Sequence, residues 1–367
     1  MNARRGAAVL LLGASLLLGM GVLGCGETGP QGPPGPSALE SCFNCHGDSP
    51  GAVSIGAITT EYEMSMHHLG HTFERKTSPC NGCHTHEGFV QRVTSGEFPA
   101  EAVEHASKVN CWTCHAPHTT GTFSVRTNAA VSFLDGSGEF DAGMGNLCAH
   151  CHQSRGASPP VPAEGQTMTP PHAFWGPHHG TQANILAGTG GFPRGMVSNS
   201  PHTLLVEDAC VTCHMVAPPS SGTAGGHTWS VTYDDHGQQT PHVASCNAAG
   251  CHESEPLSDF DFHQRQTEIA ALIDTVRAAL LTAGAVDDTD HVIAGRPYTR
   301  AEAQAVWNYL MVLEDGSRGV HNTNYARALL QTAQGLLGVQ VARAARPPGD
   351  GTPQRRRPRT EALLARR

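Results

Sequence analysis

The pattern C-x-x-C-H occurs five times in this chain of 367 residues, and it constrains the fold more than any other feature of the sequence. Two thiols at that spacing reach the two vinyl groups of one haem, and the adjacent imidazole falls onto the iron. A sixth copy is stretched, because four residues instead of two separate its cysteines. The motifs therefore predict six covalent c-type haems, held by Cys42/Cys45/His46, Cys80/Cys83/His84, Cys111/Cys114/His115, Cys148/Cys151/His152, Cys210/Cys213/His214 and Cys246/Cys251/His252.

Zinc sites and disulfides also use paired cysteines. Neither of them requires a histidine directly after every second cysteine, and all six pairs have one. The cysteine count agrees with the haem interpretation, because twelve of the thirteen cysteines belong to these pairs. Only Cys25 is left over.

The N-terminus has the organisation of a secretory signal. Arg4 and Arg5 precede an apolar stretch over residues 6–20, and small residues follow. The ending Val22-Leu23-Gly24-Cys25 resembles a bacterial lipobox, which predicts removal of residues 1–24 and lipidation of Cys25. The alternative is an uncleaved membrane anchor, because the apolar stretch approaches the roughly 20 residues that span a bilayer. Both interpretations export the chain, and we expect a periplasmic or outer-membrane lipoprotein of a bacterium.

Composition indicates how the exported part is built. Residues 25–40 contain three Gly/Pro triplets, too few for a collagen helix, and predict a stiff spacer between the lipid and the folded body. Aromatic residues make up only 5% of the chain, while glycine and proline number 42 and 25. Because such a chain builds a poor side-chain core, we expect residues 41–262 to wrap six haems that form the core of a hexahaem domain.

The pattern of apolar residues changes after residue 262. Apolar residues at helical spacing predict a helix over 263–283. Thr299 and Glu302 form a capping box for a second helix that ends near Gly316, and a third helix is expected over 324–337. Residues 263–340 are thus predicted to be a helical unit packing on the haem domain, and residues 341–367 a disordered Arg/Pro-rich tail. The expected fold class is mainly α with extensive loops, as in a compact multihaem cytochrome c.

Charge is distributed unevenly along the chain. The net charge is −9, but residues 341–367 carry eight arginines and two acids, and the signal carries two arginines, which leaves −17 for residues 26–340. An acidic body favours basic redox partner proteins and argues against nucleic acid as a partner. The membrane is expected to be reached through the N-terminal lipid.

Histidines are far more numerous than the motifs require. Six of the 23 are proximal ligands by motif, and the surplus predicts that most irons carry a second histidine on the distal side. Alternative sixth ligands are Met144, Met196 and Met215. The distal candidates are His67, His105, His118, His178, His179, His202, His227, His242 and His321.

Several stretches together resemble multihaem cytochromes c of the nitrite-reductase and cytochrome c-552/c-554 superfamily. They are Cys210-Val-Thr-Cys-His-Met215 with Gly226-His227-Thr228-Trp229, and Trp307-Asn308-Tyr309 with Gly319-Val320-His321-Asn322. The resemblance covers most of residues 40–338 and implies that His227 and His321 are distal ligands. Pentahaem nitrite reductases carry a C-x-x-C-K motif whose lysine leaves the catalytic iron open to substrate, and this chain has none.

Two classes of function follow. The first is an electron-transfer relay outside the cytoplasm, in an anaerobic or dissimilatory respiratory chain, with no catalytic residue of its own. The second is a reductase of a nitrogen or sulfur oxyanion, with one five-coordinate haem and an arginine such as Arg126 or Arg194 holding the anion. A structural or haem-storage role is a third interpretation. An iron with an exchangeable sixth position distinguishes the enzyme from the relay.

Overall fold

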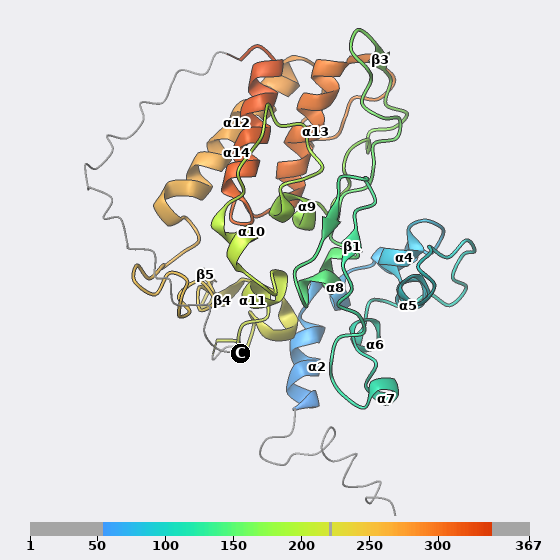
Figure 1. Cartoon of the computed structure of the whole chain (residues 1–367), viewed down its shortest axis with the longest axis vertical. Coiled ribbons are helices and arrows are strands. Elements are labelled where there is room, and N and C mark those ends of the chain that lie inside the picture. The colour runs from blue at the N-terminus through green and yellow to red at the C-terminus, as the bar shows by residue number, and fades with distance from the viewer. Residues whose placement is uncertain (1–53, 220–221, 340–367) are drawn as a thin grey trace, which may run out of the picture. The chain divides into compact units, whose positions relative to one another are not determined.

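The computed structural model describes residues 54–219 and 222–339, and Figure 1 shows the whole chain. The described residues from Gly56 onward belong to one compact unit. Cys25, the first haem motif, the Gly/Pro spacer and the Arg/Pro-rich tail lie outside the described residues, so the predictions made for them stay predictions.

Short helices joined by long loops dominate the part of the chain before residue 265, as expected for a mainly α chain with extensive loops. Most of these helices have only one or two turns and contribute few buried apolar residues. Their bounds are α2 Ile55–Glu63, α3 Met66–Leu69, η1 Thr72–Glu74, α4 Asn81–His84, α5 His86–Ser95, α6 Cys111–Cys114, α7 Pro117–Thr120, α8 Gly145–Ala149, α9 Gln182–Ala187, α10 Pro201–Leu205, α11 Cys210–His214, η2 Gly226–Thr228 and η3 Phe262–Gln264.

The strands of the described residues form three antiparallel two-stranded sheets. In the first sheet β1 (Val131–Ser132) pairs with β2 (Glu139–Phe140), and in the third β4 (Thr232–Asp235) pairs with β5 (Gln238–Pro241). The second sheet joins distant parts of the chain, because β3 (Thr167–Met168) pairs with β6 (Tyr298–Thr299). This pairing ties the long segment between the fourth and fifth motifs to the C-terminal helices.

Three longer helices follow near the C-terminus, at the positions that the sequence predicts. They are α12 (Arg265–Thr282), α13 (Arg300–Asp315) and α14 (Thr323–Leu336), and they lie side by side in Figure 1. The Thr299/Glu302 capping box at the start of α13 is present, and α13 ends at Gly316, whose φ of 70° is left-handed.

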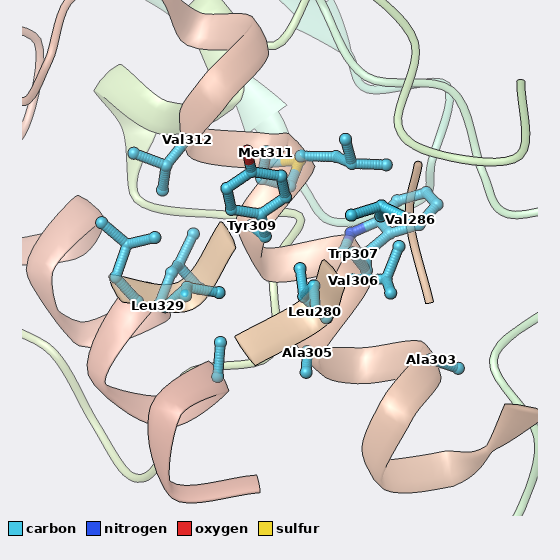
Figure 2. Packing of buried hydrophobic residues seen from close by; sticks show 14 of the residues in the cluster. Leu280, Val286, Ala303, Ala305, Val306, Trp307, Tyr309, Met311, Val312 and Leu329 are labelled. Carbon is cyan, nitrogen blue, oxygen red and sulfur yellow. The ribbon is translucent and has the colours of Figure 1, made fainter. Parts of the chain in front are cut away.

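The main hydrophobic core is built on these three helices, and Figure 2 shows part of it. It includes fully buried side chains from all three, and it also takes in residues from the segment between the fourth and fifth motifs, such as Trp175 and Ile185. The indole of Trp307 donates to the carbonyl of Gly190 over 2.8 Å, which fixes this segment against α13. The helices therefore serve as the platform for part of the motif-bearing chain.

A second, smaller cluster of buried side chains consists of Val131, Phe133, Phe140, Ala149, Ala183 and Ala209. No helix among the described residues is long and apolar enough to cross a bilayer.

Candidate haem sites

The candidate sites are numbered here by the order of their motifs in the chain. Site 1 (Cys42, Cys45, His46) lies outside the described residues. The other five are site 2 (Cys80, Cys83, His84), site 3 (Cys111, Cys114, His115), site 4 (Cys148, Cys151, His152), site 5 (Cys210, Cys213, His214) and site 6 (Cys246, Cys251, His252).

Three of the four standard motifs that the structure describes coincide with a single helical turn, namely α4, α6 and α11, and the site 4 motif begins at the end of α8 and continues into the turn that follows. In sites 2, 3 and 4 the backbone amide of the histidine donates to the carbonyl of the first cysteine over 2.9–3.1 Å. All ten described cysteines are free thiols and none is paired in a disulfide. One turn of helix thus presents two thiols and one imidazole together, as thioether attachment and axial ligation require.

The stretched motif has the same backbone hydrogen bond between its histidine and its first cysteine. The amide of His252 donates to the carbonyl of Cys246 over 2.9 Å, although two more residues lie between them than in the other motifs. The extra residues are accommodated in a turn that includes Gly250, whose φ of 84° is left-handed. Site 6 therefore reproduces the backbone closure of the standard sites.

Each of the five described proximal histidines faces a second histidine. The distances between ring centroids are 6.0 Å for His84–His178, 6.1 Å for His152–His67, 6.2 Å for His115–His227, 6.3 Å for His214–His321 and 6.4 Å for His252–His202. An imidazole nitrogen binds a first-row metal at about 2 Å, and the ring centre lies about 1.2 Å further out, so two axial rings on one iron are about 6.4 Å apart. The residues present fit a metal held between two imidazoles at every described site.

Hydrogen bonds occupy the Nδ1 atom of several of these rings. His202 bonds the Val320 carbonyl at 2.6 Å, His214 the Trp229 carbonyl at 2.9 Å, and His115 the Ser124 carbonyl at 3.3 Å. Metal-binding histidines characteristically use one ring nitrogen for such a partner and the other for the metal. The arrangement leaves Nε2 of these rings available for an iron.

The protonation state of the paired histidines also suits ligation, because only a neutral imidazole can bind a metal. Burial lowers the pKa of His67 to about 4 and that of His178 to about 3. His321 behaves differently. Burial lowers its pKa, but the carboxylate of Asp315 raises it, and the net shift is upward. The two atoms in contact, His321 Nδ1 and Asp315 Oδ1, are 2.6 Å apart, and the Asp315 side chain is fully buried.

Four of the nine distal candidates are not paired with a described proximal histidine. His242 uses Nε2, the atom an iron would need, to bond the Ala217 carbonyl at 2.9 Å. His179 bonds Glu314 through Nδ1 at 2.8 Å and is largely exposed. The ring of His118 packs against an exposed tryptophan, and His105 lies on an exposed loop before site 3.

The other predicted site residues have different surroundings. Met144 and Met196 are exposed. The guanidinium of Arg126 donates to the carbonyls of Trp112, Thr113 and His115, so it closes the end of the site 3 helix. Arg194 is exposed beside α14, where its amide bonds Thr332. Neither arginine is brought to an unpaired proximal histidine.

Exposed apolar side chains flank two of the paired histidines. Met66, beside His67, is 76% exposed, and Leu204 and Leu205, just after His202, are 69% and 76% exposed. Large apolar side chains left in water next to a candidate ligand are the surface that a porphyrin would cover. Among the described residues no group of three or more His, Cys, Asp or Glu side chains is arranged to hold a metal ion directly.

Sequence reasoning did not find the residues that surround the ligands. Asp315 ends an ordinary helix, and Trp229 follows a candidate ligand in a loop, so neither stands out by spacing or composition. Their contacts with histidines are made only in the folded chain.

Comparison with known proteins gives one similar solved structure. No family model matches the chain, and no curated protein matches it. Among solved structures, the chain is similar to the outer cell wall cytochrome OcwA, with 21% sequence identity and a TM-score of 0.48 over 76% of this chain. The match covers 50% of that protein, so the chain spans about half its length.

Proposed function

We propose that this chain is a hexahaem c-type cytochrome that relays electrons outside the cytoplasm. One observation carries the proposal: all five described proximal histidines face a second histidine at 6.0–6.4 Å between ring centroids. Haem supplies reversible one-electron chemistry at its iron, and two histidine ligands leave that iron no open position for a substrate.

The residues have separate roles in this proposal. The twelve motif cysteines attach the haems, and the six motif histidines bind the irons from the proximal side. His178, His227, His67, His321 and His202 bind the irons of sites 2, 3, 4, 5 and 6 from the distal side. The distal ligand of site 1 is one of the remaining histidines.

The relay is favoured over the reductase because a reductase needs a proximal histidine whose opposite side is empty. The described sites offer no such histidine, since each proximal ring has a partner. Arg126 is bonded to backbone carbonyls of site 3, and Arg194 is exposed beside α14, so neither is placed to hold an anion at a motif histidine. The relationship to the nitrite-reductase superfamily stays a prediction that rests on the motifs quoted above.

The setting of the relay is proposed from the sequence. Export and lipidation at Cys25 place the haem-bearing body beyond the cytoplasmic membrane, where c-type haems are attached. The acidic body fits basic docking faces on redox partner proteins, and an anaerobic or dissimilatory respiratory chain is the proposed context.

Haem content tests the proposal first. Denatured holoprotein should weigh the processed chain plus six haems, and Cys246→Ala should remove one haem mass. A wild-type protein with five haems would contradict the assignment of site 6.

Spin state tests the relay. The native ferric protein should be entirely low-spin, and the reduced protein should not bind carbon monoxide. His321→Ala should create one high-spin site that binds carbon monoxide. The matched control is His236→Asn, because the His236 side chain is 99% exposed and asparagine tolerates its left-handed backbone (φ 54°). A native high-spin iron that reduces nitrite or hydroxylamine would establish the enzyme instead.

A further inference from the structure

Site 4 lies against sites 2 and 5. Sγ of Cys83 is 3.7 Å from the His150 carbonyl, and Sγ of Cys151 is 3.7 Å from the Cys83 carbonyl. On the other side, Ala149 of the site 4 motif packs in one buried cluster with Ala209, which precedes Cys210 of site 5. The motif segments of three sites thus pack against one another, with site 4 in the middle.

A buried arginine joins sites 2 and 4. Nη1 of Arg92 donates to the His150 carbonyl over 2.8 Å and lies 3.1 Å from Sγ of Cys83, and its guanidinium stacks on Phe98 at 4.2 Å from the ring centre. Because Arg92 is 8% exposed, these contacts hold the two motifs in a fixed relation.

Trp229 contacts histidines of sites 3, 4 and 5. Its ring meets the ring of His67, paired in site 4, edge-on at 4.6 Å, and the ring of His227, paired in site 3, at 5.6 Å. Its carbonyl accepts a hydrogen bond from Nδ1 of His214, the proximal histidine of site 5, over 2.9 Å. One residue therefore touches paired histidines of three sites.

The backbone around Trp229 is shaped for this position. Its φ of 53° is left-handed, which is unfavourable for a residue with a bulky side chain. Gly225 precedes it with a φ of 68°, and a Cβ at Gly225 would lie 2.2 Å from the Val216 carbonyl, so the loop accepts only glycine there. A strained tryptophan in a tightly packed loop points to a role for its contacts.

We infer that Trp229 is a positioning residue that sets the orientation of His67 and His227 through its ring and of His214 through its carbonyl, with site 4 as the central site of the body. This inference rests on the proposed function, since orientation of an imidazole matters only if the imidazole binds an iron. Contacts outside the ligand shell orient ligands and tune the metal.

Electron paramagnetic resonance of the ferric holoprotein tests the inference, because the orientation of axial imidazoles sets the positions of low-spin signals. Trp229→Ala removes the ring and keeps the backbone carbonyl. The low-spin signals of sites 3 and 4 should therefore shift, while the signal of site 5 stays in place. Trp229→Phe keeps a smaller aromatic edge and should give smaller shifts of the same two signals.

The matched control is Phe174→Ala. Phe174 is 69% exposed and also meets a histidine edge-on, His291 at 4.9 Å, but that histidine faces no proximal ring. All signals should be unchanged in this variant.

Haem content and spin state of the wild type are measured first. Failure of the proposed relay function can then be distinguished from failure of the positioning role of Trp229. A wild type without low-spin haems would overturn the proposed function. If the wild type carries low-spin haems, unchanged spectra in both Trp229 variants would overturn only the positioning role. If Trp229→Ala yields no haem-loaded protein, Trp229→Phe decides: shifts at two sites support the role, and an unchanged spectrum refutes it.

Discussion

Replacing Asp315 with asparagine should raise the reduction potential of site 5. The carboxylate accepts a hydrogen bond from Nδ1 of His321 at 2.6 Å, and its other oxygen accepts from the amide and hydroxyl of Ser317. Asparagine keeps the shape and an acceptor oxygen for His321 but removes the negative charge. Because that charge favours the more positive ferric form of an iron bound by His321, its loss should favour the ferrous form.

The magnitude follows from the kind of hydrogen bond. A bond to a charged group contributes about 1.5–3 kcal/mol and a bond between neutral groups about 0.5–1.5 kcal/mol, so neutralising Asp315 weakens the interaction by about 1 kcal/mol. The Asp315 side chain is fully buried, so water and salt screen this difference little. For a one-electron couple about 59 mV corresponds to a tenfold change in equilibrium constant, and about 1 kcal/mol to about 40 mV. Only the part of this weakening that differs between the ferric and ferrous forms shifts the potential, so one of the six midpoint potentials should rise by at most about that amount.

Spectroelectrochemical titration of the holoprotein measures this shift. Asp235→Asn is the matched control, because Asp235 also lies beside a histidine, His236 at 3.8 Å, but that side chain is 99% exposed and is not a proposed ligand. Its potentials should match those of the wild type. An Asp315→Asn protein with six unchanged potentials, or a fall in one of them, would refute the reasoning.

Three further outcomes are expected for stability and one for anchoring. Leu329→Ala empties a fully buried position in the helical core and should lower the free energy of unfolding by about 2–5 kcal/mol, measured by denaturant titration. Thr299→Ala removes the capping box of α13 and should cost about 1 kcal/mol in the same assay. The pKa of Glu302 is lowered from its ordinary 4.5 in the folded protein: burial opposes this shift, while the amide of Thr299 and the charge of Arg296 cause it. The stability it contributes is therefore complete above pH 4.5 and lost as the pH falls through the lowered value, and Glu302→Gln should flatten that part of a stability–pH curve. Cys25→Ala should abolish lipidation and release the haem-loaded body from membranes, as judged by fractionation and mass; a variant that stays membrane-bound would contradict the lipid anchor.

Local patterns in the sequence were sufficient for several parts of this protein. The motif cysteines and histidines could be recognised because haem attachment needs them within one turn of chain, where spacing alone fixes geometry. The C-terminal helices could be placed because apolar periodicity and capping are also local, and α13 begins after Thr299 as its capping box predicts. The five histidines that lie opposite a described motif histidine were all among the nine candidates, but the sequence offered no means of choosing them.

The tertiary structure decided which histidine faces which. A distal ligand has to bring only one nitrogen to an iron, so the residues around it are unconstrained and leave no local signature. His67 precedes its partner His152 in the chain, whereas His321 follows its partner His214, and no rule of spacing covers both. Asp315 and Trp229 gain their roles in the same way, because packing of α13 and of the loop after η2 brings them against histidines that are distant in sequence. The sequence by itself determined the spacing of the motif cysteines and histidines and the attachment chemistry that they predict, and only the folded chain determined which histidines lie together and what surrounds them.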